Sequence, residues 1–259
     1  MAKKPPVRAK RTAKGQKPRW ICNLVPSGDT HRDWKFEDAI AGDALTAAAA
    51  LPPSTDLRTA WWKVGNQEST GSCVGWASTD GVMRFHLVKA GKIAKNVRLS
   101  PHYTWMASKE TDEYVTRPET FIEEAGTSLK AAMEICRKYG VALESDLPFH
   151  VNTTMFGGKE NSFYTGCVLR RAAAYFNMFR NFSQWRTWLA SNGPILVGLN
   201  VDATWDQASS TRGKLDTFQP DTVRGGHAVC LVGYRKDGRF IVRNSWDTTW
   251  GDAGFGYAS

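Results

Sequence analysis

Apolar residues in the first half of the chain recur at a helical spacing. Residues 73–90 contain no proline and stop at Gly91, and their apolar side chains are Trp76, Ala77, Met83, Leu87 and Val88. This pattern predicts a helix whose first turn holds Cys73. A second helix is predicted to begin at Pro101, with Ser100 as its N-cap.

A third helix is predicted between Gly126 and Gly140. Its apolar face is formed by Leu129, Ala132, Met133, Cys136 and Tyr139. Glycine is the residue that most often closes a helix, because it adopts a positive φ without strain. We therefore expect this helix to end at Gly140.

The pattern changes after Pro194. Three short apolar runs, at residues 195–199, 228–232 and 240–242, predict buried strands. Between the helical half and the strand half, residues 152–166 are rich in Gly, Asn and Thr and show no periodicity. We therefore expect an inserted loop there.

Length and charge limit the other classes of function. The chain has 259 residues, 42% of them hydrophobic, which is enough for one domain with an ordinary core. No apolar run reaches the roughly 18 residues that a membrane span needs. The formal net charge is +9, but residues 1–19 carry eight basic and no acidic side chains, which leaves +1 for the rest. We expect this tail to be a disordered, solvated arm, and it is the only part predicted to reach nucleic acid or an acidic surface. No membrane contact, cofactor or metal is predicted.

Cys73 is the residue with the clearest candidate chemistry. A thiol is mostly protonated at neutral pH, so a nucleophilic cysteine needs a nearby base and a field that favours its anion. At the start of a helix, unpaired N–H groups and the positive end of the dipole would lower the thiol pKa. Gly71 and Ser72 precede it and let a substrate backbone come close. His227, which follows two glycines, is the candidate base.

A cysteine, a later histidine and a still later asparagine, here Cys73, His227 and Asn244, follow the order found in papain-type cysteine peptidases. The run Asn-Ser-Trp that begins at Asn244 is a highly specific motif of that family. The chain resembles the family from about Leu51 to its last residue. The resemblance implies an α+β fold with a helical lobe, an antiparallel β-barrel-like lobe, and the active-site cleft between them.

The resemblance also implies roles for single residues. Gln67, six residues before the cysteine, matches the glutamine whose side-chain amide forms the oxyanion hole together with the cysteine N–H. Asn244 matches the residue that orients the imidazole, and Trp246 matches the residue that shields this hydrogen bond from water. Substrate contacts are expected from Gly71, Ser72, Gly126, Gly226 and Trp246.

Within this resemblance the peptidase domain covers residues 51–259, with a helical lobe at about 66–150 and a strand lobe at about 151–259. Residues 20–50 are too few for the long helical propeptide of secreted members. Their aromatic side chains stand in a polar context, which predicts that the segment packs on the enzyme: Trp20, Trp34 and Phe36. It is either a brace of the strand lobe, which we favour slightly, or a short pro-segment lying across the cleft in place of substrate.

Cysteine usage departs from the secreted members of the family. Those members carry a disulfide near the nucleophile, and here Thr70 and residues 123–125 occupy the two positions. Five cysteines, an odd number without a visible framework, suit a reducing compartment, so a cytoplasmic location is expected. Cys136 and Cys230 lie in apolar patterns and are expected in the core.

Together these residues predict thiol-dependent hydrolysis of peptide or amide bonds in a peptide or protein substrate, through a cysteine acyl-enzyme. Two other functions stay open at this stage. A transpeptidase or ligase would use the same residues, with an amine in place of water. A catalytically silent module would keep only the peptide-binding cleft, and it is disfavoured because Gln67, Cys73, His227 and Asn244 are all present.

Overall fold

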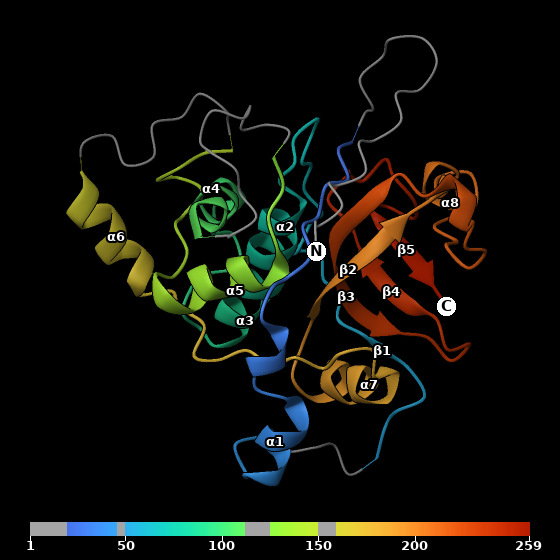
Figure 1. Ribbon diagram of the computed structural model, residues 1–259, viewed down its shortest axis with the longest axis horizontal. Helices are drawn as coiled ribbons and strands as arrows, with labels where there is room; N and C mark the ends of the chain where they lie inside the picture. The colour runs from blue at the N-terminus through green and yellow to red at the C-terminus, as the bar shows by residue number, and fades with distance from the viewer. Residues whose placement is uncertain (1–19, 46–49, 112–124, 150–158) are drawn as a thin grey trace, which may run out of the picture.

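The computed structural model describes residues 20–45, 50–111, 125–149 and 159–259, which form two lobes side by side (Figure 1). The predicted basic tail, residues 1–19, lies outside the described residues. One lobe is helical, with elements α2 (Cys73–Gly75), η2 (Trp76–Met83), α3 (Arg84–Lys89), α4 (Pro101–Thr111), α5 (Leu129–Lys138) and α6 (Glu160–Val168). No helix among the described residues is both long and apolar enough to cross a membrane.

The predicted helix at residues 73–90 is confirmed. Elements α2, η2 and α3 follow one another without a break, and the middle element winds as a π-helix. The chain then turns at Gly91, which has a φ of 67°. Every residue from Cys73 to Phe85 is buried, because the sheet packs against this helix from one side and α4 and α5 pack against it from the other.

Helices α4 and α5 begin where the sequence predicts. The hydroxyl of Ser100 accepts a hydrogen bond from the Tyr103 N–H at 3.1 Å. The hydroxyl of Ser128 accepts one from the Ala131 N–H at 3.1 Å, so each serine satisfies an N–H group that the helix leaves unpaired. The expected burial of Tyr139 is wrong: it is 49% exposed and lies at the C-cap, after the last residue of α5.

The second lobe is a five-stranded antiparallel sheet, β1 (Thr55–Asp56), β2 (Ile195–Val201), β3 (Gly225–Tyr234), β4 (Phe240–Arg243) and β5 (Phe255–Ala258). All three predicted strands are therefore present. β3 lies at the centre and pairs with β1, β2 and β4. The helix α7 (Phe182–Ser191) covers one face of the sheet, and α8 (Ala203–Asp206) and η3 (Pro220–Thr222) lie between β2 and β3 in the chain.

The loop predicted at residues 152–166 is wrong in its second half. Helix α6 begins at Glu160, and its side chains Phe163, Tyr164 and Cys167 pack on Tyr103 of the helical lobe. Three apolar residues on one side of a short helix are enough to dock it, although glycine and polar neighbours hide the period. The strand lobe therefore does not begin at residue 151, because α6 packs with the helical lobe. Residues 150–158 lie outside the described part.

A buried ionic cluster joins the two lobes. The Asp80 carboxylate of η2 lies 2.6 Å from Arg243 at the end of β4, and 3.2 Å from both Arg84 and Arg98. Burial opposes ionisation of Asp80, but the three guanidinium groups hold its pKa below the usual range. Arg243 precedes Asn244 directly, so this cluster fixes the strand that carries the asparagine against the helix that carries Cys73.

Candidate active site

The thiol of Cys73 lies at the beginning of α2 and is fully buried. The backbone N–H groups of Ala228, Val74 and Cys73 itself face the sulfur and act to lower its pKa. Ala228 follows His227 on β3, so the helix start and the central strand meet at the sulfur. The sequence-predicted nucleophile and base are brought together in this way, from positions 154 residues apart in the chain.

The imidazole of His227 is held from two sides. Its Nε2 atom lies 2.7 Å from Asn244 Oδ1, and the indole of Trp246 stacks on the ring at a centroid distance of 4.8 Å. Nδ1 is buried and has no hydrogen-bond partner among the residues that the structure describes. Nε2 is therefore the orienting nitrogen, and Nδ1 is left to exchange a proton.

Gln67 is fixed by the residues that follow Asn244. Its Oε1 atom accepts hydrogen bonds from Ser245 Oγ at 2.8 Å and from Trp246 Nε1 at 3.2 Å. With the oxygen held in this way, the amide nitrogen of Gln67 is the group that can donate to other partners. Sequence reasoning missed the role of Ser245, and the only signal for it was its place inside the Asn-Ser-Trp run.

Burial dominates the protonation of the nucleophile and its base. It raises the pKa of Cys73 to about 11, against the backbone N–H groups that lower it. It lowers the pKa of His227 to about 4, against the hydrogen bond to Asn244 that raises it, while the Arg224 charge lowers it further. The lowered thiol pKa expected from the helix start is thus wrong for this state, because a covered site disfavours both charges of an ion pair.

The sequence of residues 51–259 matches the family model described as "Papain family cysteine protease". The chain belongs to this family. Its members hydrolyse peptide bonds with a cysteine thiol, and the Cys-His-Asn triad typical of the family is the arrangement described above. The predicted α+β two-lobed fold is likewise that of the family.

Similar proteins are known from several organisms. Over 235 residues the protease is 29% identical to cysteine proteinase 3 of Entamoeba histolytica, which spans 87% of this chain and 69% of the relative. It is 27% identical to ananain of Ananas comosus, over 85% of this chain and 59% of the relative. The structure of xylellain, a cysteine protease from Xylella fastidiosa, has a similar fold with a TM-score of 0.75 and 20% identity, over 95% of this chain and 92% of the other.

Residues 20–25 of this papain-family chain lie between the two lobes, in contact with the active-site residues (Figure 1). The amide Nε2 of Gln67 donates to the Ile21 carbonyl at 3.2 Å and to the Thr70 carbonyl at 3.0 Å. The Leu24 N–H donates to the Gly226 carbonyl at 3.0 Å. The donor expected to bind an oxyanion is therefore already occupied by a carbonyl oxygen of the chain itself.

Four of the five predicted substrate-binding residues contact this segment. A Cβ atom added to Gly71 or Gly126 would collide with Asn23, and Gly226 bonds Leu24 as described. Trp246 stacks on Trp20 at a centroid distance of 4.6 Å with the planes 4° apart. The fifth, Ser72, is buried and its hydroxyl lies 2.6 Å from that of Thr70, and its expected contact with substrate stays a prediction.

The next part of the N-terminal segment packs elsewhere. Phe36, in α1 (Phe36–Ala41), is buried in the core of the strand lobe and meets the Trp188 ring edge-on. Trp34 contacts Phe176 but is 68% exposed, so the expected packing holds for Phe36 and not fully for Trp34. The Asn177 N–H donates to the Trp34 carbonyl at 2.8 Å.

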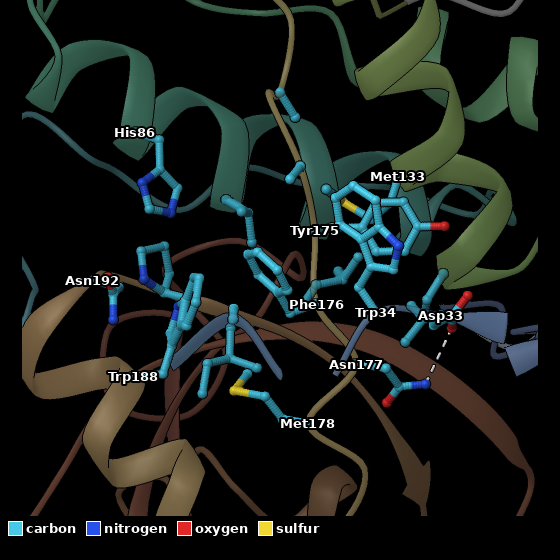
Figure 2. Close-up of a pocket in the computed structure, with 18 of the residues that line it drawn as sticks. Asp33, Trp34, His86, Met133, Tyr175, Phe176, Asn177, Met178, Trp188 and Asn192 are labelled. Carbon is cyan, nitrogen blue, oxygen red and sulfur yellow. Dashed lines mark hydrogen bonds between the residues drawn. The ribbon is translucent and has the colours of Figure 1, made fainter. Parts of the chain in front are cut away.

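A cavity of about 1040 Å³ lies between α1, α3, α5 and α7 (Figure 2). Its walls are largely apolar, with Trp34, Met133, Phe176 and Trp188 among them, and Asn177 Nδ2 donates to Asp33 Oδ2 at its edge at 3.2 Å. None of the four predicted catalytic residues lines it. The cavity is therefore separate from the active site.

Proposed function

We propose that this chain is a cysteine protease whose own residues 20–25 keep it latent. The observation that carries this proposal is the hydrogen bond from Gln67 Nε2 to the Ile21 carbonyl. A carbonyl oxygen at this donor takes the place that a scissile carbonyl needs. Residues 20–25 must leave before a peptide can reach Cys73.

The four predicted residues divide the chemistry between them once the cleft is open. The Cys73 sulfur attacks the scissile carbonyl, and Nδ1 of His227 takes the thiol proton and then gives it to the leaving amine. Gln67 Nε2 and the Cys73 N–H stabilise the oxyanion. Asn244 keeps the imidazole in the required orientation through the 2.7 Å hydrogen bond.

Water then completes the reaction. His227 removes one proton from a water molecule, the hydroxide adds to the thioester carbonyl, and the C–S bond breaks to regenerate the thiol. An amine in place of this water would give transpeptidation. No feature of the described residues favours that reaction over hydrolysis. Hydrolysis is therefore the reaction proposed.

The direction of the segment supports latency over self-cleavage. Trp20 stacks on Trp246, which lies on His227, so the N-terminal end of the segment is beside the residue that protonates the leaving amine. Leu24 lies further along, at Gly226 and Gly198. In a bound substrate, the residues C-terminal to the scissile bond lie on the side of the leaving amine. Residues 20–25 therefore run through the cleft in the opposite direction to a substrate, and none of their peptide bonds is oriented for cleavage.

A single substitution in the full chain tests latency. Leu24 is half-buried and packs against the cluster that contains Cys73, so a carboxylate in its place would be partly desolvated without a partner. We expect Leu24→Asp to raise the hydrolysis rate of a small peptide amide by tenfold or more. A tenfold increase corresponds to a loss of about 1.4 kcal/mol in the free energy with which residues 20–25 bind the cleft. Leu169→Asp, at a side chain that is 69% exposed, is the matched control.

Two further results define the proposal. Adding Cys73→Ala to Leu24→Asp must abolish hydrolysis with little change in melting temperature; residual hydrolysis would assign the chemistry to another group. If Leu24→Asp instead lowers the melting temperature and leaves the rate unchanged, residues 20–25 act only as a brace.

The proposal includes a reducing compartment such as the cytoplasm. All five cysteines are free thiols in the structure, and four of them are buried. We expect five thiols on titration of the anaerobically purified, denatured protein, and a native disulfide would contradict this location. Contact with nucleic acid or an acidic surface is proposed only for residues 1–19.

A further inference from the structure

Arg224 lies on the side of the active site where the leaving group departs. It precedes β3, and its guanidinium carbon is 5.6 Å from the centroid of the Trp246 ring. Trp246 in turn stacks on His227. The leaving amine must lie beside the imidazole that protonates it, so Arg224 borders the part of the substrate that follows the scissile bond.

One edge of the Arg224 guanidinium makes no geometrically sound hydrogen bond among the residues that the structure describes. Its Nε and Nη2 atoms are both buried and have no hydrogen-bond partner among the described residues. Nη2 lies 3.0 Å from the carboxylate of Asp206 as an ion pair, and Asp206 is itself 55% exposed. Nε–H and Nη2–H form the edge that a carboxylate takes with two parallel hydrogen bonds. Leaving the buried Nε–H without an acceptor is costly, which indicates that this group is used in another state.

The occupied cleft places a weak acceptor, the sulfur of Cys22, against this edge. The thiol of Cys22 lies against Arg224, whose charge acts to lower the thiol pKa although burial raises it to about 12. Residues 20–25 read Trp-Ile-Cys-Asn-Leu-Val and contain no acidic side chain. Departure of the segment therefore exposes a cation whose Nε–H, beside the ion pair of Nη2 with Asp206, can donate to a carboxylate of the substrate.

We propose that Arg224 binds a carboxylate on the leaving-group side of the substrate, and that this carboxylate is an aspartate or glutamate side chain directly after the scissile bond. The inference rests on the proposed function, because it concerns a substrate of the same site. It makes Arg224 a residue that determines specificity, in addition to the residues that carry the chemistry.

Paired peptides test the inference in the full chain. The two peptides have one sequence and an amidated C-terminus, and differ only by Glu or Gln after the scissile bond. We expect the ratio of their kcat/KM values to favour Glu by about tenfold, the size of one charge-assisted hydrogen-bonded pair. Occupancy of the cleft by residues 20–25 lowers both values by the same factor and cancels in the ratio.

Variants separate substrate binding from support of Trp246. Arg224→Gln should bring the ratio to about one, Arg224→Lys should restore part of it, and Arg224→Glu should favour a peptide with Lys after the scissile bond. A role confined to packing on Trp246 would lower both kcat/KM values and leave the ratio unchanged. Arg180→Gln, which removes an exposed positive charge before α7, should leave the ratio at its parent value.

Other outcomes of the peptide comparison distinguish this inference from the proposed function. Equal cleavage of the Glu and Gln peptides by the parent chain overturns this inference while the proposed function stands. Cleavage of neither peptide by the Leu24→Asp chain, whose cleft is expected to be open, contradicts the proposed function. A third peptide with Gln and a free C-terminal acid identifies the source of the carboxylate. If this peptide is preferred and the Glu peptide is not, Arg224 binds the end of the substrate chain and the proposed side-chain recognition is wrong.

Discussion

Two stretches of the N-terminal segment hold the enzyme in different ways. Residues 20–25 bind through backbone groups: the Ile21 carbonyl to Gln67, the Leu24 N–H to Gly226 and the Val25 N–H to Thr127. Helix α1 binds through Phe36, which is 3% exposed in the core of the strand lobe. The first stretch contacts residues that the reaction needs, and the second contacts only the scaffold.

Under the proposed latency, the N-terminal segment acts both as a brace and as an occupant of the cleft. A tethered segment competes with substrate at a high local concentration, which its anchor sets. Because α1 stays on the strand lobe, residues 20–25 can leave the cleft and return without dissociating from the protein. The predictions below therefore treat the two stretches separately.

Removal of the anchor should have the largest effect on stability. Phe36→Ala deletes a buried aromatic ring that contacts Trp188, and such changes destabilise by about 3–5 kcal/mol. We expect chemical unfolding to show this loss. Trp34→Ala, at a side chain that is 68% exposed, should cost far less. Equal losses for the two variants would mean that α1 is not an anchor.

Gln67→Ala should slow catalysis and also weaken the binding of residues 20–25 to the cleft. Loss of one oxyanion donor lowers kcat by about 10²–10³ in other acyl-transfer enzymes. The same donor binds Ile21, so we also expect faster alkylation of Cys73 than in the parent chain. Gln207→Ala, at an exposed residue after α8, is the control for both measurements. Slower hydrolysis without faster alkylation would show that this hydrogen bond does not hold the segment.

The sequence could predict the site best where several motifs agree. Cys73, His227 and Asn244 were found because each lies in its own short signature, and the buried helix and strands around them follow simple apolar periods. Helix α6 was missed since only three apolar residues define its buried face. Its position depends on Tyr103, a contact that no local pattern contains.

The contacts of residues 20–25 could not be predicted for a related reason. Backbone carbonyl and N–H groups make most of them, and every residue but proline carries both. Arg224 shows the same limit: its sequence neighbours gave no sign that it would lie over Trp246 or that its Nε–H would be buried without an acceptor among the described residues. Such features follow from which segments meet in space.

Acid should release the first stretch and leave the second in place. Burial lowers the pKa of His227 to about 4, from an ordinary value of 6.5, so the open cleft binds a proton more readily than the covered one. The equilibrium between the covered and the open cleft therefore shifts towards the open cleft as pH falls from 6.5 towards 4, by about tenfold for each pH unit. Cys73 has the corresponding effect at alkaline pH. Its pKa of about 11 in the covered cleft lies above the ordinary 9.0, so the equilibrium also shifts towards the open cleft as pH rises from 9 to 11.

Hydrogen exchange distinguishes the two stretches in one experiment. The amides of Leu24 and Val25 bond to Gly226 and Thr127, and their protection should fall between pH 6.5 and 4 after correction for the intrinsic exchange rate. The Ala39 amide bonds to the Lys35 carbonyl within α1 and should keep its protection over that range. Parallel loss at all three amides would show that acid loosens the whole segment, in which case His227 does not govern the release of residues 20–25.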